Sequence, residues 1–182
     1  MKKKFIFDLD LTLYSELDHI NSENEDVYYN SFKKKNFLRK LLIKLPHKKY
    51  IFTNANLEHA KLVLKKLNLK NIFSNIMSSD LANDQYKPNV NIYLEAIKDF
   101  KIKKNDEIYF FEDQEVNLKT AKNKFNWKTI LISPDRYTKK KYIDYKFNTI
   151  EEALLYFNIL NNVEQNGGTS VHWQKANCIR EY

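Results

Sequence analysis

Short apolar runs alternate with amphipathic stretches along most of the chain. The apolar, β-branched and aromatic runs predict five strands, at residues 5–7, 50–52, 72–77, 108–111 and 129–132. Between and after them, apolar residues recur at helical spacing within residues 37–45, 57–67, 92–100, 116–125 and 153–157. This alternation predicts an α/β fold, a doubly wound, Rossmann-like parallel sheet with helices on both faces. The ligand site of such a fold lies at the carboxyl ends of the strands.

The expected domain organisation is one core followed by a short tail. A chain of 182 residues can bury one substantial core, so we expect a single domain over residues 1–160, interrupted by an insert at residues 14–36. Residues 161–182 contain both glycines and the one cysteine, Cys178, and show no clear helix or strand period. We therefore expect a flexible tail there. A single cysteine excludes both an intramolecular disulfide and a cysteine metal cluster.

The charge balance narrows the classes of partner. The formal net charge is +8, which favours anionic partners such as phosphorylated small molecules. Arginine, however, occurs only at positions 39, 136 and 180, and nucleic-acid surfaces usually rely on its bidentate contacts. Nucleic-acid binding is therefore the weaker interpretation. The apolar runs are too short for a membrane span or a signal peptide, so we expect a soluble, cytoplasmic protein without a membrane partner.

Polar side chains gather where the predicted strands end. Carboxylates, a hydroxyl, an amide and a lysine ammonium group follow three of the runs or precede a predicted helix: Asp8, Asp10, Thr53, Asn54, Lys87, Glu112 and Asp113. Because parallel strands end at one edge of a sheet, we expect these groups to lie close together. Crowded carboxylates need a cation, and a site with only oxygen ligands favours Mg²⁺. Mg²⁺ also binds phosphate oxygens, so the sequence predicts a site for a phosphoryl group.

Four segments carry a resemblance to a known family. FDLDLTLY, FTNANLEHA, YKPNVNIY and YFFEDQEVN resemble, in order, the four motifs of the haloacid dehalogenase-like hydrolases. The resemblance covers about residues 4–133 and is greatest for the pyrimidine 5′-nucleotidase branch. It implies a Mg²⁺-dependent phosphomonoester hydrolase that acts on a nucleotide or a similar small phosphorylated metabolite.

The resemblance also implies a role for each acid. Asp8 would be the nucleophile that forms an aspartyl-phosphate intermediate. Asp10 would protonate the leaving alcohol and then deprotonate the hydrolytic water. Asp8, the backbone carbonyl of Asp10 and Asp113 would bind Mg²⁺, and Glu112 would bind it directly or through water.

Three further residues would hold the phosphoryl group if the resemblance is correct. The Thr53 hydroxyl, a backbone N–H near Asn54 and the Lys87 ammonium group would bind its oxygens. Each also has a structural interpretation. Thr53 could begin a helix, and Lys87 could be one of the many solvated lysines of this chain.

The insert is the main departure from the nucleotidase branch. Members of that branch place a helical cap of many tens of residues between the first two motifs, whereas this chain offers only residues 14–36. The site is therefore open, or covered by a short helix or by a second copy of the chain in a homo-oligomer, or activity was lost with the cap. The last case would leave a catalytically weak phosphate- or nucleotide-binding module. An open site also suits a sugar-phosphate or phosphoprotein phosphatase.

Four other positions carry specific expectations. Asn117 either supports the metal site or is a plain exposed helix residue. We interpret His59 as a structural histidine, because the chemistry already has its acid and base. Asn68 and Asn126 stand at predicted helix ends in a chain with almost no glycine, so we predict a positive φ angle at both.

Overall fold

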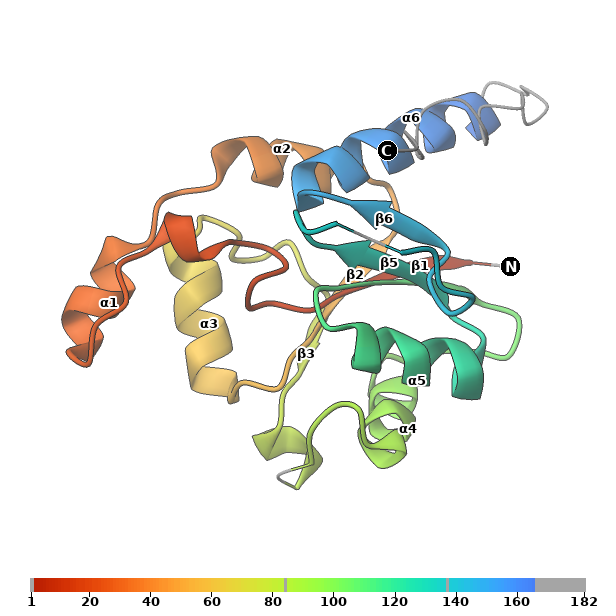
Figure 1. Cartoon of the computed structure of the whole chain (residues 1–182), viewed down its shortest axis with the longest axis horizontal. Helices are drawn as coiled ribbons and strands as arrows, with labels where there is room; N and C mark the ends of the chain where they lie inside the picture. The colour runs from red at the N-terminus through yellow and green to blue at the C-terminus, as the bar shows by residue number, and fades with distance from the viewer. Residues whose placement is uncertain (1, 84, 137, 166–182) are drawn as a thin grey trace.

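Six parallel strands form the central sheet of the computed structural model, which describes residues 2–83, 85–136 and 138–165 (Figure 1). The strands are β1 (Lys3–Phe7), β2 (Lys48–Phe52), β3 (Asn75–Met77), β4 (Glu107–Glu112), β5 (Lys128–Ile132) and β6 (Tyr145–Phe147). They lie in the order β3-β2-β1-β4-β5-β6, and every neighbouring pair is parallel. The predicted α/β fold is confirmed, although the sequence pattern misses β6 and starts β3 too early.

Helices cover both faces of the sheet. The helices are α1 (Glu25–Ser31), α2 (Asn36–Lys44), α3 (Leu57–Lys66), α4 (Val90–Asp99), α5 (Glu115–Phe125) and α6 (Ile150–Gln165). Two 3-10 turns, η1 (Glu16–Asp18) and η2 (Asp80–Ala82), lie in the loops. Buried residues of α2, α3 and α6 pack on one face of the sheet, and those of α4 and α5 pack on the other (Figure 1). The doubly wound arrangement is therefore complete.

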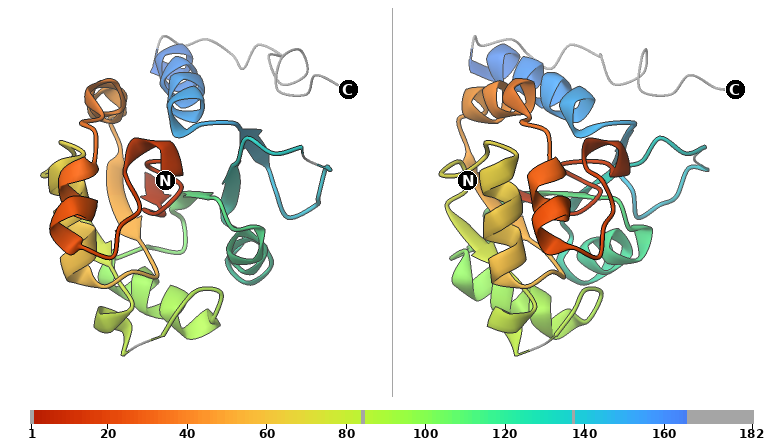
Figure 2. Two further views of the ribbon diagram at one scale, coloured as in Figure 1. Left: turned by 60° about the vertical axis from the view of Figure 1, so that its left-hand side comes forward. Right: turned by 90° about the vertical axis from the view of Figure 1, so that its left-hand side faces the viewer.

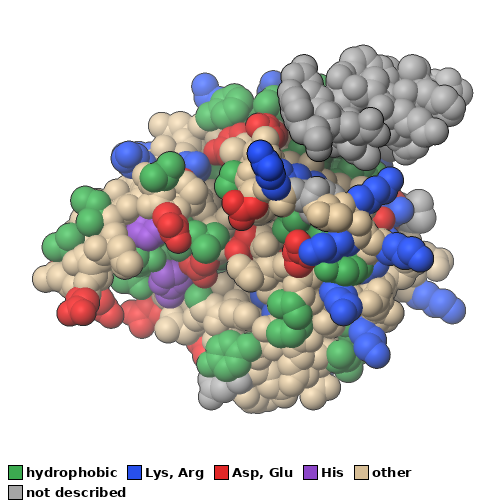
Figure 3. Space-filling model, in the orientation of Figure 1, with side chains coloured by type: hydrophobic (Ala, Val, Ile, Leu, Met, Phe, Trp, Pro, Cys, Tyr) green, Lys and Arg blue, Asp and Glu red, His purple; other side chains and the backbone are tan. Residues whose placement is uncertain are grey.

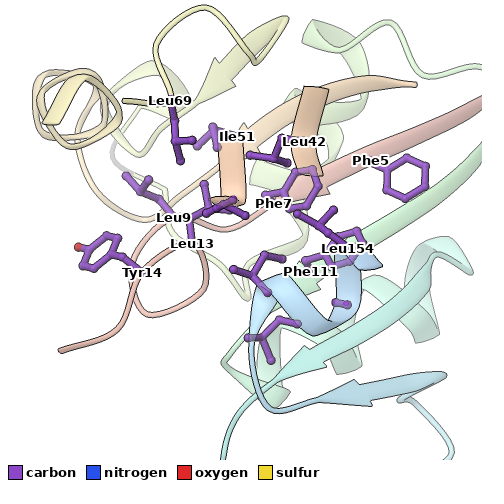
Figure 4. Packing of buried hydrophobic residues seen from close by; sticks show 14 of the residues in the cluster. Phe5, Phe7, Leu9, Leu13, Tyr14, Leu42, Ile51, Leu69, Phe111 and Leu154 are labelled. Atoms are coloured by element: carbon purple, nitrogen blue, oxygen red, sulfur yellow. The ribbon is translucent and has the colours of Figure 1, made fainter. Parts of the chain in front are cut away.

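Successive residues of the central strands pack into two separate hydrophobic cores, one on each face of the sheet. Phe5 and Phe7 of β1 pack with the α2, α3 and α6 side, where Leu154 also lies (Figure 4), whereas Ile6 packs with α4 and α5. The rings of Phe7 and Phe111 stack with centroids 4.6 Å apart, and these two residues are also register partners of β1 and β4. Both faces of the strands are buried, which explains their continuous apolar sequence. The register places the carboxyl ends of β1 and β4 side by side.

The last helix passes through the boundary that the sequence suggests at residue 160. α6 ends at Gln165, and the buried Asn161 hydrogen bonds through Oδ1 with Nε2 of His47 at 2.8 Å. The helix thus continues past residue 160, and Asn161 is buried against the rest of the domain. The rest of the expected tail, residues 166–182, lies outside the described residues. In the described part of the chain, no helix is both long enough and apolar enough to cross a bilayer.

The two asparagines at helix ends have the predicted left-handed backbone. φ is 64° at Asn68, just after α3, and 53° at Asn126, which ends α5. Asparagine tolerates this geometry better than other residues with a Cβ atom, which explains how the helices end without glycine.

Replacing Asn126 by alanine should lower the free energy of unfolding by about 1 kcal/mol, because alanine has no side-chain amide to support a positive φ. Asn126→Gly should be neutral or slightly stabilising. Asn123→Ala is the matched control, since Asn123 is exposed inside α5 and alanine there should stabilise by about 0.5 kcal/mol. Urea unfolding measures all three, and equal losses for Asn126→Ala and Asn126→Gly would contradict the backbone explanation.

Candidate functional site

The loop after β1 presents two acids at the edge of the sheet. The backbone N–H of Asp8 donates to the carbonyl of Phe111 at 2.9 Å, so Asp8 extends β1 alongside β4. Leu9 and Leu13 are fully buried and anchor the loop in the core (Figure 4). Leu9 and Leu13 thus hold the loop while Asp8 and Asp10 stay at the strand end, and Leu11 between them is exposed.

A buried lysine bridges two of the acids. Nζ of Lys87 lies 2.7 Å from Oδ1 of Asp8 and 2.7 Å from Oε2 of Glu112, and it donates to the carbonyl of Phe52 at 2.8 Å. The Lys87 side chain is 1% exposed, as is that of Glu112. An ammonium group has three protons, and these three acceptors use all of them. Lys87 therefore orients the two acids here, and its contact with a phosphoryl group stays a prediction.

Burial and mutual charge shift the pKa values of Asp8, Glu112 and Lys87. Burial raises the pKa of Asp8 to about 6, although Lys87 opposes the shift. Burial, together with the charge of Asp8, raises the pKa of Glu112 well above its usual value. The pKa of Lys87 is raised although burial acts to lower it, because its two carboxylate partners outweigh burial. At neutral pH, Asp8 is thus still a carboxylate, the form that a nucleophile needs.

Two asparagines hold this arrangement in place. The backbone N–H of Lys87 donates to Oδ1 of Asn54 at 2.7 Å, and Nδ2 of Asn54 donates back to the Lys87 carbonyl at 3.1 Å. The side chain of Asn54 therefore fixes the Lys87 loop, whereas its expected substrate contact through a backbone N–H stays a prediction. Nδ2 of Asn117 donates to Oε2 of Glu112 at 3.0 Å. Asn117 is buried, so the exposed interpretation is wrong, and its support of a metal site stays a prediction.

Three carboxylates lie close enough to share a metal ion. Asp8, Glu112 and Asp113 each offer an oxygen, and these atoms lie within 4.8 Å of one another. Three acids against the single ammonium group of Lys87 leave a local excess of negative charge, and a donor set of oxygens alone suits a hard divalent cation. The residues therefore fit a metal. The Asp10 carboxylate is not part of this group. Binding of the metal by the backbone carbonyl of Asp10 stays a prediction.

Asp10 has a different set of partners. Its Oδ1 accepts hydrogen bonds from the Tyr14 hydroxyl and, at 2.9 Å, from Nε2 of His59. Among the described residues, Oδ2 accepts a single long contact, 3.4 Å from the Thr53 hydroxyl. Burial acts to raise the pKa of Asp10, but the hydrogen bonds from His59 and Tyr14 outweigh it, so this pKa lies below its ordinary value. Asp8 and Asp10 thus have pKa values shifted in opposite directions.

His59 is closer to the chemistry than the sequence indicates. Its Nε2 contacts Asp10 directly, and its Nδ1 lies 3.0 Å from the Tyr29 hydroxyl. Tyr14 and Tyr29 complete this chain of contacts, and sequence reasoning gives neither of them a role. Tyr14 stands four residues after Asp10, a usable signal, whereas nothing in the sequence links His59 to Tyr29.

The insert, residues 14–36, forms one wall of a cleft of about 760 Å³ beside Asp10. The lining residues are Asp10, Leu11, Tyr14, Glu16, His19, Asn21, Tyr28, Tyr29, Ala55, Asn56 and His59. Figure 2 shows α1 running beside α3. Among the alternatives for the short insert, the structure therefore places a short helix beside the site.

The structure brings the sequence-predicted residues together at one edge of the sheet. Lys87 joins Asp8 to Glu112, and Thr53, fully buried at the end of β2, reaches Asp10. Asp113 lies at the metal group and accepts a 3.4 Å hydrogen bond from the Thr12 hydroxyl. The arrangement can place a nucleophile, a separate proton carrier and a cation site around one substrate atom.

Solved structures with the same fold include dehalogenases and a sugar-phosphate enzyme. A dehalogenase with an intermediate complex is 23% identical with a TM-score of 0.57; the match covers 67% of this chain and 54% of that one, so this chain spans about half of it. L-2-haloacid dehalogenase from Xanthobacter autotrophicus is 13% identical over 91% of this chain and 99% of that one, with a TM-score of 0.66. A protein described as a beta-phosphoglucomutase from Thermotoga maritima is 16% identical over 90% and 100%, with a TM-score of 0.67.

Sequence comparison identifies the family. No curated protein sequence matches this chain significantly. The family model described as haloacid dehalogenase-like hydrolase matches residues 15–132, which include Thr53, Lys87, Glu112 and Asp113. The segment with Asp8 precedes this match, and its contacts with Lys87 tie it to the same site. The chain therefore belongs to the haloacid dehalogenase-like hydrolases.

Proposed function

We propose that this hydrolase is a Mg²⁺-dependent phosphomonoesterase that works through an aspartyl-phosphate on Asp8. The observation that carries the proposal is the separation of two neighbouring acids into different environments. Asp8 faces Lys87 and the metal group, whereas Asp10 is held by Tyr14 and His59. Two carboxylates with different partners can divide the tasks of nucleophile and proton carrier, one beside the cation site and the other free to exchange a proton.

The metal site would be held by Asp8, Asp113 and Glu112, with the Asp10 carbonyl as a further ligand. When bound, Mg²⁺ would neutralise charge on the phosphoryl oxygens. The proposed metal site is supported by three acids whose ligand oxygens lie within 4.8 Å of one another. Glu112 is already paired with the Lys87 ammonium group, whereas Asp113 accepts from the neutral Thr12 hydroxyl and Gln114 amide, so we propose that Asp113 is the closer ligand of the two.

The first step forms a bond between Asp8 and phosphorus. Lys87 holds Oδ1 of Asp8, which leaves Oδ2 to attack. As this bond forms, the bond from phosphorus to the leaving oxygen breaks, and the departing alkoxide takes a proton from Asp10. In the second step, Asp10 removes a proton from the water that attacks phosphorus, and Asp8 is released with inorganic phosphate as the other product.

The two oxygens of Asp10 have different roles in this scheme. Tyr14 and His59 occupy Oδ1 and fix the carboxyl group, so Oδ2 is the oxygen that exchanges the proton with the leaving group and then with water. The lowered pKa makes Asp10 a carboxylate in the ligand-free site, the form that later removes a proton from water. Asp10 therefore enters the first step with a proton that binds together with the negatively charged phosphoryl group, whose charge favours the protonated form. Thr53, adjacent to Oδ2, would hold a phosphoryl oxygen.

Several structural neighbours are described as dehalogenases, and the site suits displacement of a halide from carbon less well. A halide leaves without a proton and without a metal ion on the electrophile, so neither Asp10 nor the acidic group would be needed. Phosphoester cleavage uses both, because an alkoxide needs a proton and a phosphoryl group needs its charge neutralised. Within this class we propose a nucleotide or a similar small phosphorylated metabolite as substrate.

Asp8→Asn should abolish turnover of any phosphomonoester, because the amide is a poor nucleophile. Asp10→Asn should lower kcat for alkyl phosphates by about 10²–10⁴-fold. With p-nitrophenyl phosphate, whose phenolate leaves without a proton, Asp10→Asn should instead release a stoichiometric burst of nitrophenol and then stall. Stopped-flow absorbance measures the burst. Asp26→Asn, an exposed acid of α1, is the control and should keep full turnover. Absence of the nitrophenol burst in Asp10→Asn would contradict the assignment of Asp10 as the acid.

Adding Mg²⁺ to EDTA-treated protein should raise Tm by roughly 5–10 °C at a free concentration about 100 times Kd. The shift should shrink from pH 8 to pH 5, since Asp8, with its pKa raised to about 6, takes up a proton that competes with the metal. The raised pKa of Asp8 also affects the stability of the metal-free protein, because the folded state binds the proton more tightly than the unfolded state. This stabilisation is fully present below pH 3.8 and is lost as the pH rises through about 6.

Asp113→Asn should remove the Mg²⁺ shift without destabilising the metal-free protein, because the charge of Asp113 repels Asp8 and Glu112. Glu95→Gln, an exposed acid of α4, should keep the full shift. Differential scanning calorimetry measures each variant with EDTA and with Mg²⁺. A full shift in Asp113→Asn would contradict the proposed metal site.

A further inference from the structure

We propose that the cleft beside Asp10 selects phosphomonoesters whose leaving alcohol carries a flat, uncharged ring and no second anionic group. This inference rests on the proposed function and names the substrate class of the same site. Nucleoside monophosphates belong to this class, whereas sugar bisphosphates and nucleoside diphosphates do not.

The position of Asp10 fixes where the leaving group lies. Asp10 donates its proton to the leaving oxygen, so that oxygen must come within hydrogen-bond distance of its carboxyl group. Asp10 also lines the cleft, and Asp8 and Lys87 do not. The phosphoryl group therefore sits toward Asp8, and the rest of the substrate extends past Asp10 into the cleft. A volume of about 760 Å³ is within the range of small-molecule sites.

The insert and α3 give this cleft an aromatic wall. Five ring-bearing residues line it: Tyr14, His19, Tyr28, Tyr29 and His59. The Tyr28 ring meets those of His19 and Tyr29 edge to face, with centroids 5.0 and 5.1 Å apart. Behind them, the buried Phe32 stacks on His19 at 4.7 Å. These contacts hold the rings in fixed orientations before a ligand arrives, which favours stacking of a flat ring.

The wall contains no lysine or arginine among its described lining residues, although the chain has 31 of them. Its charged members are two acids, Asp10 and Glu16. Figure 3 shows acidic and histidine side chains near α1, whereas many of the lysine and arginine side chains on this face lie around α5 and β6. A second phosphate or carboxylate of a substrate would meet these acids without a cation, which disfavours it. An uncharged polar ring could instead use the amide of Asn21.

The test compares kcat/KM across four substrates that differ by one feature each: adenosine 5′-monophosphate, adenosine 3′,5′-bisphosphate, ribose 5-phosphate and glycerol phosphate. The monophosphate should exceed ribose 5-phosphate by about three- to tenfold through stacking. It should exceed the bisphosphate by about tenfold through charge repulsion. Equal values for the monophosphate and ribose 5-phosphate, or for the monophosphate and the bisphosphate, would overturn the inference.

Two variants separate the ring contact from the charge. Tyr28→Leu should lower the ratio of monophosphate to ribose 5-phosphate, and Glu16→Lys should raise the ratio of bisphosphate to monophosphate by about tenfold. Glu23→Lys makes the same charge change in the insert at an exposed residue outside the cleft lining, and should leave both ratios unchanged. A matching gain in Glu23→Lys would show general attraction of anions, and would overturn the role of the cleft.

A second measurement distinguishes failure of the proposed phosphatase function from failure of the inference about the cleft. If no phosphomonoester is turned over, the phosphatase proposal fails, and equilibrium binding of uncharged adenosine to the full chain decides the inference. Binding that weakens in Tyr28→Leu would support the aromatic wall, and adenosine that fails to bind, or binds Tyr28→Leu equally well, would overturn it. If glycerol phosphate is hydrolysed as well as the monophosphate, the phosphatase proposal stands and only the inference fails.

Discussion

The buried contact of Lys87 with Asp8 and Glu112 is the interaction on which the site depends. Two carboxylates this deep would take up protons without a cation, and removing one partner of such a group typically costs about 3–5 kcal/mol. Lys87 comes from the loop before α4, Asp8 from the end of β1 and Glu112 from the end of β4. The ion group therefore joins three segments where the chain order of the sheet changes direction, between β1 and β4.

A second constraint is the separation of Asp10 from this group. Asp8 and Asp10 stand two residues apart, yet buried Leu9 and Leu13 fix the loop so that Asp10 meets Tyr14 and His59 instead of Lys87. The insert takes part in this separation, since Tyr29 of α1 contacts His59. A short insert thus both forms a wall of the cleft and helps to orient Asp10 through His59.

The sequence predicts those features that local pattern and strand direction determine. Asp8, Thr53 and Glu112 are predictable because parallel strands end at a common edge, and the positive φ of Asn126 is predictable because a helix end without glycine needs asparagine. β6, with only Tyr145–Phe147, is too short and too polar to give a strand pattern. The contact of His59 with Asp10 depends on the packing of α3 against the β1 loop, and no sequence period carries that information.

Mass spectrometry of acid-quenched protein tests the central claim most directly. Asp10→Asn protein mixed with an aryl phosphate and Mg²⁺ should accumulate the intermediate, because the variant lacks the base for its hydrolysis. Our account predicts a phosphoryl group on the peptide that contains Asp8, absent when EDTA replaces Mg²⁺. Release of the aryl alcohol with no phosphorylated peptide, or with the phosphoryl group on another residue, would contradict the assignment of Asp8 as nucleophile.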